Sequence, residues 1–178
     1  MDAKFAYLII AHNEFDVLST LIALLDDERN DIYVHIDKKV KTMPLLSAKH
    51  SQLFILDNRI DTRWGNVSQI KTEYSLFEAA YAHGGYARYI MLSGVHLPLK
   101  SQDYIHQWMD EKPDMEIMAP VPNNAFQSDL KLHRYNFFTK QFAKSKFAQR
   151  LWNLGIIIQR KLNIHRNVGA KFSISANW

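Results

Sequence analysis

The chain of 178 residues contains no cysteine, and this absence excludes several classes of protein. Without thiols it can form neither a disulfide scaffold nor a redox pair, and no zinc site can use cysteine ligands. The absence also suits a reducing compartment. Glycine and proline are sparse, at six and five residues, whereas 47% of the chain is hydrophobic. This composition disfavours a disordered chain and predicts a folded domain with a buried core.

Long hydrophobic runs and the common catalytic motifs are missing as well. The apolar run Phe5–Ala11 ends at His12, whereas a membrane-spanning helix needs about 20 apolar residues. We therefore expect a buried strand there, and neither a signal peptide nor a membrane span. The sequence has no P-loop, no GxGxxG after its first strand, and no HExxH or GxSxG. It therefore gives no support to ATP hydrolysis or to a Rossmann dinucleotide site.

Acidic residues are absent from the last part of the chain. Residues 1–129 hold 12 Lys and Arg and 18 Asp and Glu, a net charge of −6. Residues 130–178 hold 10 Lys and Arg and no acid, a net charge of +10. A basic segment without acids implies an anionic partner, which is a phosphate-bearing substrate, a membrane surface or a nucleic acid.

Strand and helix patterns alternate along the first 118 residues. Apolar runs rich in β-branched and aromatic residues predict strands at residues 5–11, 32–39, 53–56, 89–92 and 115–118. Three helices are predicted, after an N-cap at Asn13, from Asn66 to Gly84, and after an N-cap at Ser101. The second helix has one apolar stripe, formed by Ile70, Tyr74, Phe77 and Tyr81. The alternation predicts an α/β fold with a mostly parallel sheet.

Polar side chains follow four of these strands at the point where each strand ends. They are His12, Asn13 and Glu14, then His35 with Asp37 and Lys38, then Asp57 to Arg59, and finally Ser93 with His96. Parallel strands end at one edge of a sheet, and open α/β sheets bind ligands at that edge. A single histidine would most simply be structural, but several polar strand ends on one edge favour a nucleotide-type pocket.

The sequence also lacks Asp-x-Asp, the tripeptide with which many nucleotide-sugar transferases hold a divalent metal. Asp114-Met115-Glu116 is the nearest in chemistry, but it stands at the start of a predicted strand, where a solvated turn is expected. If the ligand is a diphosphate, Lys or Arg must neutralise its charge in place of Mg²⁺.

Residues 140–163 are predicted to form a basic amphipathic helix. Apolar residues recur on one face, at Phe147, Leu151, Leu154, Ile158 and Leu162, and Lys and Arg lie mostly elsewhere around it. Two interpretations remain open. The helix packs on the core as an ordinary surface helix, or residues 140–162 rest on an anionic membrane. Nucleic acid is disfavoured, because the aromatic residues fall at helical core spacing.

Five segments together resemble the core-2/I-branching β-1,6-N-acetylglucosaminyltransferases (glycosyltransferase family 14), in their bacterial branch. The segments are AYLIIAHNE, YVHIDKK, RIDTRWGNVS, YIMLSGVHLPLKS and HRYNFF at residues 133–138. Their order and spacing are similar to the family's, and they cover most of residues 5–138. The resemblance implies a GT-A-like (Rossmann-like) fold, flanked by helices, and an inverting transfer from a UDP-sugar, typically UDP-GlcNAc, without a metal or other cofactor.

The resemblance also implies which residues form the UDP-sugar site. By position they are His12, Asn13, His35, Asp37, Arg59, Trp64, Ser93 and His96. The first two strand ends would hold the uridine, and Arg59 and Trp64 would close the nucleotide side. Ser93 and His96 stand where metal-dependent relatives carry Asp-x-Asp, although many members have Asp at the position of His96.

The end of the chain resembles the family's Gly-Ser-Gln-Trp segment, through Ser175-Ala176-Asn177-Trp178. The resemblance implies that Asn177 and Trp178 contact the donor sugar or the acceptor. In the family the catalytic carboxylate and the Arg and Lys that bind the diphosphate follow that segment. We therefore expect the chain to be the N-terminal portion of a longer enzyme, with its catalytic base beyond Trp178.

These inferences give a domain organisation and a set of partners. Residues 1–138 are expected to form the nucleotide-sugar-binding core, and residues 139–178 a basic helical segment and the start of the donor and acceptor segment. The expected partners are a UDP-sugar donor and a glycan or lipid-linked oligosaccharide acceptor, in the bacterial cytoplasm or at the inner membrane. The alternatives are a xylosyltransferase-type relative that uses UDP-xylose, and a non-catalytic module that binds an anionic ligand or nucleic acid.

Overall fold

The computed structural model describes residues 4–63, 66–117, 125–137 and 145–167. The chain forms two compact units, residues 1–115 and residues 116–178. The boundary predicted at residue 138 divides the chain by function, into a nucleotide-sugar core and a donor and acceptor segment. The compactness of the two units does not test such a division, so it stays a prediction.

The first unit is built on a four-stranded parallel sheet. Its strands are β1 (Phe5–Ala11), β2 (Asn30–Ile36), β3 (Gln52–Ile55) and β4 (Arg88–Ser93). They lie in the order β3-β2-β1-β4, and every neighbouring pair is parallel. The two central strands are almost completely buried, as expected for strands covered on both faces. The predicted α/β, GT-A-like class is therefore confirmed.

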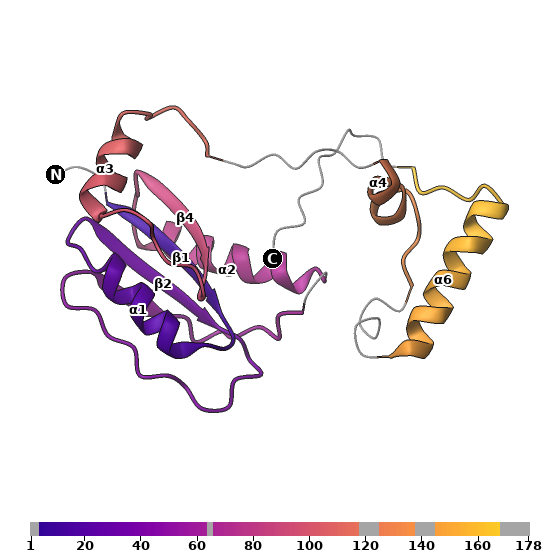
Figure 1. Ribbon diagram of the computed structural model, residues 1–178, viewed down its shortest axis with the longest axis horizontal. Coiled ribbons are helices and arrows are strands. Elements are labelled where there is room, and N and C mark those ends of the chain that lie inside the picture. The colour runs from indigo at the N-terminus through magenta and orange to yellow at the C-terminus, as the bar shows by residue number, and fades with distance from the viewer. Residues whose placement is uncertain (1–3, 64–65, 118–124, 138–144, 168–178) are drawn as a thin grey trace. The chain divides into compact units, whose positions relative to one another are not determined.

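Helices cover both faces of this sheet (Figure 1). Helix α1 (Phe15–Leu25) packs four fully buried aliphatic residues against one face, and α2 (Ser68–His83) covers the other. Alternate strand residues supply the two cores, so that Tyr7 and Ile9 face α1 while Ala6 and Leu8 face α2. Burial of each large aliphatic side chain contributes about 1.5–3 kcal/mol to stability.

The observed elements differ from the expected ones at four places. Strand β2 spans Asn30–Ile36, whereas residues 32–39 were predicted. Helix α1 is capped by Glu14, in a left-handed conformation with φ 50° and no side-chain cap, and Asn13 lies outside it. Helix α2 begins at Ser68, and the Asn66 side chain accepts a hydrogen bond from the Ser68 N–H in a turn before it. The strand expected at residues 115–118 is absent from residues 115–117, and residue 118 lies outside the described residues.

The apolar stripe of α2 (Ile70, Tyr74, Phe77 and Tyr81) lies mostly on the exposed side of the helix. Tyr74 is 63% and Tyr81 79% exposed, while Thr72, Leu76 and Ala80 are fully buried. Small side chains at two of these three positions let the helix approach the sheet closely, and Thr72 Oγ1 donates to the Ser68 carbonyl inside it. Periodicity alone does not decide which face is buried, because both faces have helical spacing.

A buried polar network joins α3 (Gln102–Asp110) to the amino-terminal edge of the sheet. The Asn30 side chain donates to the Gln102 Oε1 (2.9 Å) and pairs through Oδ1 with His106 Nε2 (2.9 Å). The His106 ring stacks on Phe5 with centroids 4.0 Å apart. The predicted Ser101 cap is confirmed, since its Oγ accepts from the Tyr104 N–H. Nothing in the spacing of these residues indicated the network, because its members are far apart in sequence.

The network predicts a loss of stability in mild acid. Burial lowers the pKa of His106, and the Arg29 charge lowers it further. The folded state then binds fewer protons than the unfolded state. The stability that neutral His106 contributes is therefore complete above a pH of about 6.5 and is lost as the pH falls. We expect the His106→Gln variant to show a shallower fall of unfolding free energy between about pH 7 and pH 5.

Urea unfolding at a series of pH values measures this slope. Some slope should remain in the variant, because burial lowers the pKa of His35 as well. An unchanged slope in His106→Gln would show that His106 is not desolvated in the folded state.

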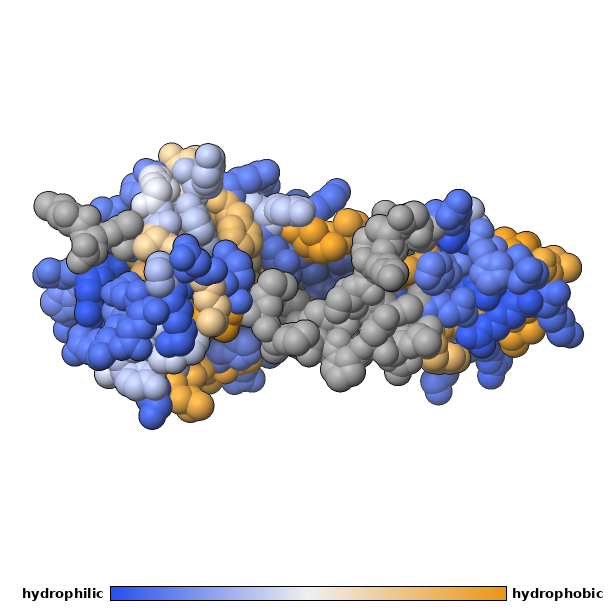
Figure 2. Space-filling model, turned by 90° about the horizontal axis from the view of Figure 1, so that it is seen from above, coloured by the Kyte–Doolittle hydropathy of each residue, from blue (hydrophilic) through white to orange (hydrophobic). Residues whose placement is uncertain are grey.

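The second unit contains α4 (Ala125–Leu132) and α6 (Lys146–Lys161). The segment after α4 fixes α6 through polar contacts: the Gln159 side chain accepts from the Tyr135 N–H and donates to the Tyr135 carbonyl, and Trp152 Nε1 donates to Asn136. Figure 2 shows hydrophobic and hydrophilic surface side by side on α6, at the right-hand end of the view. Of the helix expected from residue 140, residues 140–144 lie outside the described residues.

Within the described residues, no helix combines the length and the hydropathy that a bilayer crossing would require.

Candidate functional site

The parallel topology brings the four polar strand ends to one edge of the sheet. His35 and Ser93 both pair in register with Ile10, so the three side chains form one row on the α2 face. His35 and Ser93 are therefore two strand spacings apart, about 10 Å. His12 and Asn13 are exposed directly after β1, between these two strands in the sheet order. The edge predicted from the sequence is thus assembled as expected.

His35 supports the loop after β3 from inside the sheet. Its ring is fully buried, and Nε2 accepts a hydrogen bond from the Ile60 N–H at 2.9 Å. This contact requires the neutral tautomer with the proton on Nδ1, and among the described residues Nδ1 has no partner. Burial lowers the pKa of His35, and the opposing charge of Asp37 only partly compensates. The ring therefore stays neutral at pH 7.

Asp37, at the end of β2, holds the same loop through its buried carboxylate. Oδ1 accepts from the Lys39 N–H (2.7 Å), and Oδ2 accepts from the Lys39 Nζ (2.7 Å) and the Thr62 N–H (3.1 Å). The Asp37 side chain is 3% exposed and that of Lys39 is 52% exposed. A carboxylate with three donors already in place acts first as an anchor for the loop, a role that the sequence did not indicate.

An ion-pair chain continues from Asp37 along the loop. Lys39 Nζ also contacts Asp61 Oδ1 at 3.0 Å, and Arg63 donates two hydrogen bonds to Asp61 Oδ2. The hydrogen bonds from Arg63 and Lys39 lower the pKa of Asp61 to about 2. Burial alone would lower the pKa of Lys39, but the bonds to Asp37 and Asp61 outweigh it and raise that pKa. Lys39, Asp61 and Arg63 therefore remain charged at neutral pH.

Arg59 binds backbone carbonyls at the end of β2. Its Nε donates to the Ile36 carbonyl (3.1 Å), and Nη2 donates to the carbonyls of Asp37 (2.7 Å) and Val40 (2.5 Å). These contacts draw the loop after β3 against the end of β2. The contact between Arg59 and the nucleotide stays a prediction. The contacts that Arg59 makes in the structure are with the protein backbone.

The turn after β4 lies against the end of β1. The Gly94 N–H donates to the Ile10 carbonyl at 2.8 Å, and a Cβ at Gly94 would lie 2.7 Å from the Ala11 Cβ. Only glycine therefore allows the turn to approach β1 so closely. The turn is closed by His96, whose Nδ1 accepts from the Ser93 N–H at 3.2 Å. Ser93 is half-buried and His96 is exposed, both beside the end of β1.

Three predicted site residues lie outside the described residues, namely Trp64, Asn177 and Trp178. Within the described ranges, no three His, Asp or Glu side chains gather as a metal site would need. The described acids at this edge also differ in their suitability as a base. Asp37 and Asp61 are held in ion pairs, whereas Glu14 is exposed at the start of α1.

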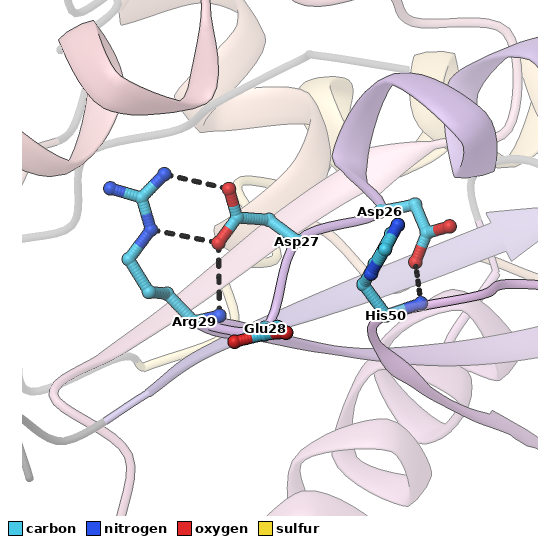
Figure 3. A pocket seen from close by; sticks show the side chains of 5 residues that line it. All are labelled: Asp26, Asp27, Glu28, Arg29 and His50. Atoms are coloured by element: carbon cyan, nitrogen blue, oxygen red, sulfur yellow. Dashed lines mark hydrogen bonds and ion pairs between the residues drawn. The ribbon is translucent and has the colours of Figure 1, made fainter.

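A hollow of about 410 Å³ lies at the opposite, amino-terminal edge of the sheet (Figure 3). Its lining comes from the turn before β2 and from the residue that precedes β3 by two positions: Asp26, Asp27, Glu28, Arg29 and His50. Figure 3 shows Arg29 bound to Asp27 by two hydrogen bonds from its guanidinium and one from its backbone N–H, while Asp26 accepts from the His50 backbone N–H. The charged groups are used to close these turns, so we do not assign the ligand to this hollow.

Comparison with known proteins identifies the family. The model of the family described as "Core-2/I-Branching enzyme" matches residues 5–158, which is most of the chain. No curated protein matches the chain. The family match contains the strand ends, the loop after β3 and the turn after β4 described above, and it extends into α6. The chain therefore belongs to the Core-2/I-branching enzyme family, a family of glycosyltransferases.

Proposed function

We propose that the chain forms the nucleotide side of an inverting, metal-independent glycosyltransferase that takes its sugar from a UDP-sugar, with GlcNAc as the expected sugar. The observation that carries this proposal is that the polar strand ends meet at the carboxyl edge of the sheet, where open α/β folds bind nucleotides. His12 and Asn13 face the solvent there, between His35 and Ser93 in the strand order.

Cations at this edge of the sheet would contribute to neutralising the diphosphate. Lys38 is exposed directly after Asp37, at the end of β2. Lys39 is half-exposed, and its ammonium already forms ion pairs with two carboxylates, so it would attract a phosphate less strongly. A Lys or Arg contact supplies the charge stabilisation that a metal supplies in related chemistry.

Inverting transfer also needs a base that removes the proton from the acceptor hydroxyl. A carboxylate in an ion pair with a lowered pKa is a weak base, which describes Asp61. Asp37 is occupied by three donors. The proposal therefore assigns no catalytic base to these acids. The acceptor is a glycan or a lipid-linked oligosaccharide, used at the cytoplasmic side of a bacterial membrane.

Calorimetric titration of the chain with UDP in the presence of EDTA tests the proposal. We expect binding without added metal, weakened about tenfold by Asn13→Ala, since one hydrogen bond to a ligand is worth about 1–1.5 kcal/mol. Competition between UDP-GlcNAc and UDP-xylose then distinguishes the donor from its nearest alternative.

Glu28→Gln provides a matched control, because Glu28 lies in the hollow at the other edge of the sheet. It should leave UDP affinity unchanged. Binding that requires Mn²⁺ contradicts metal independence. Absence of UDP binding, together with steeply salt-dependent binding of DNA, would favour a non-catalytic module.

A further inference from the structure

Helix α6 has one face that is fixed inside its own unit. Ala148, Ile156 and Gln159 are buried, and the Gln159 side chain forms hydrogen bonds with both backbone groups of Tyr135. Arg134 adds a contact at the end of the helix, where Nη1 donates to the Gln159 carbonyl. These contacts fix the rotation of the helix about its axis, and so they determine which residues face outward.

The outward face carries the apolar stripe. Phe147, Leu154 and Ile158 are 69%, 52% and 45% exposed. Their spacings of seven and four residues place them on one line along the helix. Leu162, just after the helix, is 66% exposed. Of the five apolar residues noted in the sequence, only Leu151 is half-buried. The other four do not belong to the face of α6 that packs inside the unit.

Cations adjoin this stripe directly. At 100° per residue, Arg150 and Lys161 fall beside Leu154, with Lys146 further along the same side. All three are exposed. Helix α6 contains no acidic residue. In the same unit Asp129 already pairs with Arg134 and Arg160. The stripe and its cations, Phe147, Leu154, Ile158, Arg150 and Lys161, are called the α6 outer face below.

Three kinds of partner could meet the α6 outer face: the same face of a second copy, a nucleic acid and an anionic bilayer. A second copy that met the first through this same face would bring cations against cations, since α6 has no acid to pair with them. A nucleic acid would pair with the cations but would place charged phosphates against Phe147, Leu154 and Ile158. An anionic bilayer accepts apolar side chains below its headgroups and attracts Lys and Arg at its surface.

We propose that the α6 outer face binds the surface of an anionic phospholipid membrane, with the helix lying in the plane of the interface. Phe147, Leu154 and Ile158 enter the acyl boundary, and Arg150 and Lys161 remain at the phosphates, as long cationic side chains do at interfaces. This surface does not depend on the nucleotide site, so its failure would leave the proposed transferase activity untouched.

Sedimentation of the full chain with vesicles tests the proposal. We expect binding to phosphatidylcholine vesicles only when phosphatidylglycerol is included, and a decrease as salt is raised. Arg150→Gln with Lys161→Gln should weaken binding about thirtyfold. Phe147→Gln with Leu154→Gln and Ile158→Gln should weaken it at least a hundredfold, because three apolar side chains no longer leave water. All five positions are at the surface, so circular dichroism should show folded variants.

A matched control comes from the other exposed apolar stripe of the chain. Tyr74→Gln with Tyr81→Gln removes two highly exposed aromatic side chains from α2, where Glu73 and Glu78 lie near Lys71 in the sequence. These changes should leave vesicle binding intact. The proposal is overturned if the chain ignores anionic vesicles, if it binds neutral vesicles equally well, or if the control weakens binding as much. It is also overturned if light scattering shows a dimer that the α6 apolar changes dissociate.

Discussion

Replacing Asp37 by alanine is expected to lower the free energy of unfolding of the first unit by about 3 kcal/mol, because removal of one partner leaves the other groups of a buried pair uncompensated. The Lys39 N–H and the Thr62 N–H both lose their acceptor, and the Lys39 ammonium keeps only Asp61 and the Thr62 carbonyl. The half-exposure of Lys39 keeps the estimate at the lower end of the range for buried pairs. The loop after β3 should loosen around Thr62 while His35 and Arg59 still hold it to β2, and UDP binding should weaken.

Hydrogen exchange of the β1 and β2 amides reports the stability of this unit by itself. Asp57→Ala is a suitable control, since Asp57 is an exposed carboxylate at the end of β3. A surface change of that kind should stay within about 0.5 kcal/mol of the wild type. If Asp37→Ala were as mild as the control, the ion-pair chain would not be what holds the loop.

Replacing Gly94 by alanine is expected to destabilise the first unit by about 1–3 kcal/mol, the usual cost of inserting a methyl group into a packed site. The new Cβ would lie 2.7 Å from the Ala11 Cβ and 3.3 Å from the Ala11 Cα. Ala11 is 2% exposed and ends a central strand, so it has no room to move. The turn that carries Ser93 and His96 would have to shift instead, which should weaken UDP binding as well.

Two further variants make this prediction specific. Ala11→Gly removes the clashing Cβ, so the double variant should recover part of the stability lost in Gly94→Ala, and the four measured stabilities form a double-mutant cycle. Gly155→Ala makes the same chemical change in α6, where no atom lies within 4 Å of the added Cβ. It should stabilise the helix by up to about 1 kcal/mol. Additive effects of Gly94→Ala and Ala11→Gly would exclude the proposed clash.

The predicted strands agreed well with the structure where the signal was local. Phe5–Ala11 reproduces β1 residue for residue, and the predicted strands at residues 53–56 and 89–92 overlap β3 and β4 closely. Such apolar runs can be recognised as strands from a short stretch of sequence, because a strand buried on both faces must be apolar throughout. Once the order of strands and helices is known, the right-handed crossover rule brings their carboxyl ends to one edge.

The roles of the site residues were much harder to predict from the sequence. Asp37 and Arg59 were singled out for a ligand, yet their observed contacts are with Lys39, Thr62 and the carbonyls of β2. A charged side chain at a strand end looks the same in sequence whether it meets a ligand or a loop. The closing partner comes from about 25 residues away, at Thr62 for Asp37 and at Ile60 for His35.

By itself, the sequence determined the α/β class, the approximate positions of the four strands of the sheet, the family resemblance and the basic character of the last 49 residues. Each of these follows from composition, or from patterns within a short window of the chain. Only the tertiary structure decided which face of α2 and of α6 is buried, that Gly94 must lack a side chain, and that Asp37 anchors a loop. These depend on distances between residues far apart in the chain, and such distances exist only after the elements have packed.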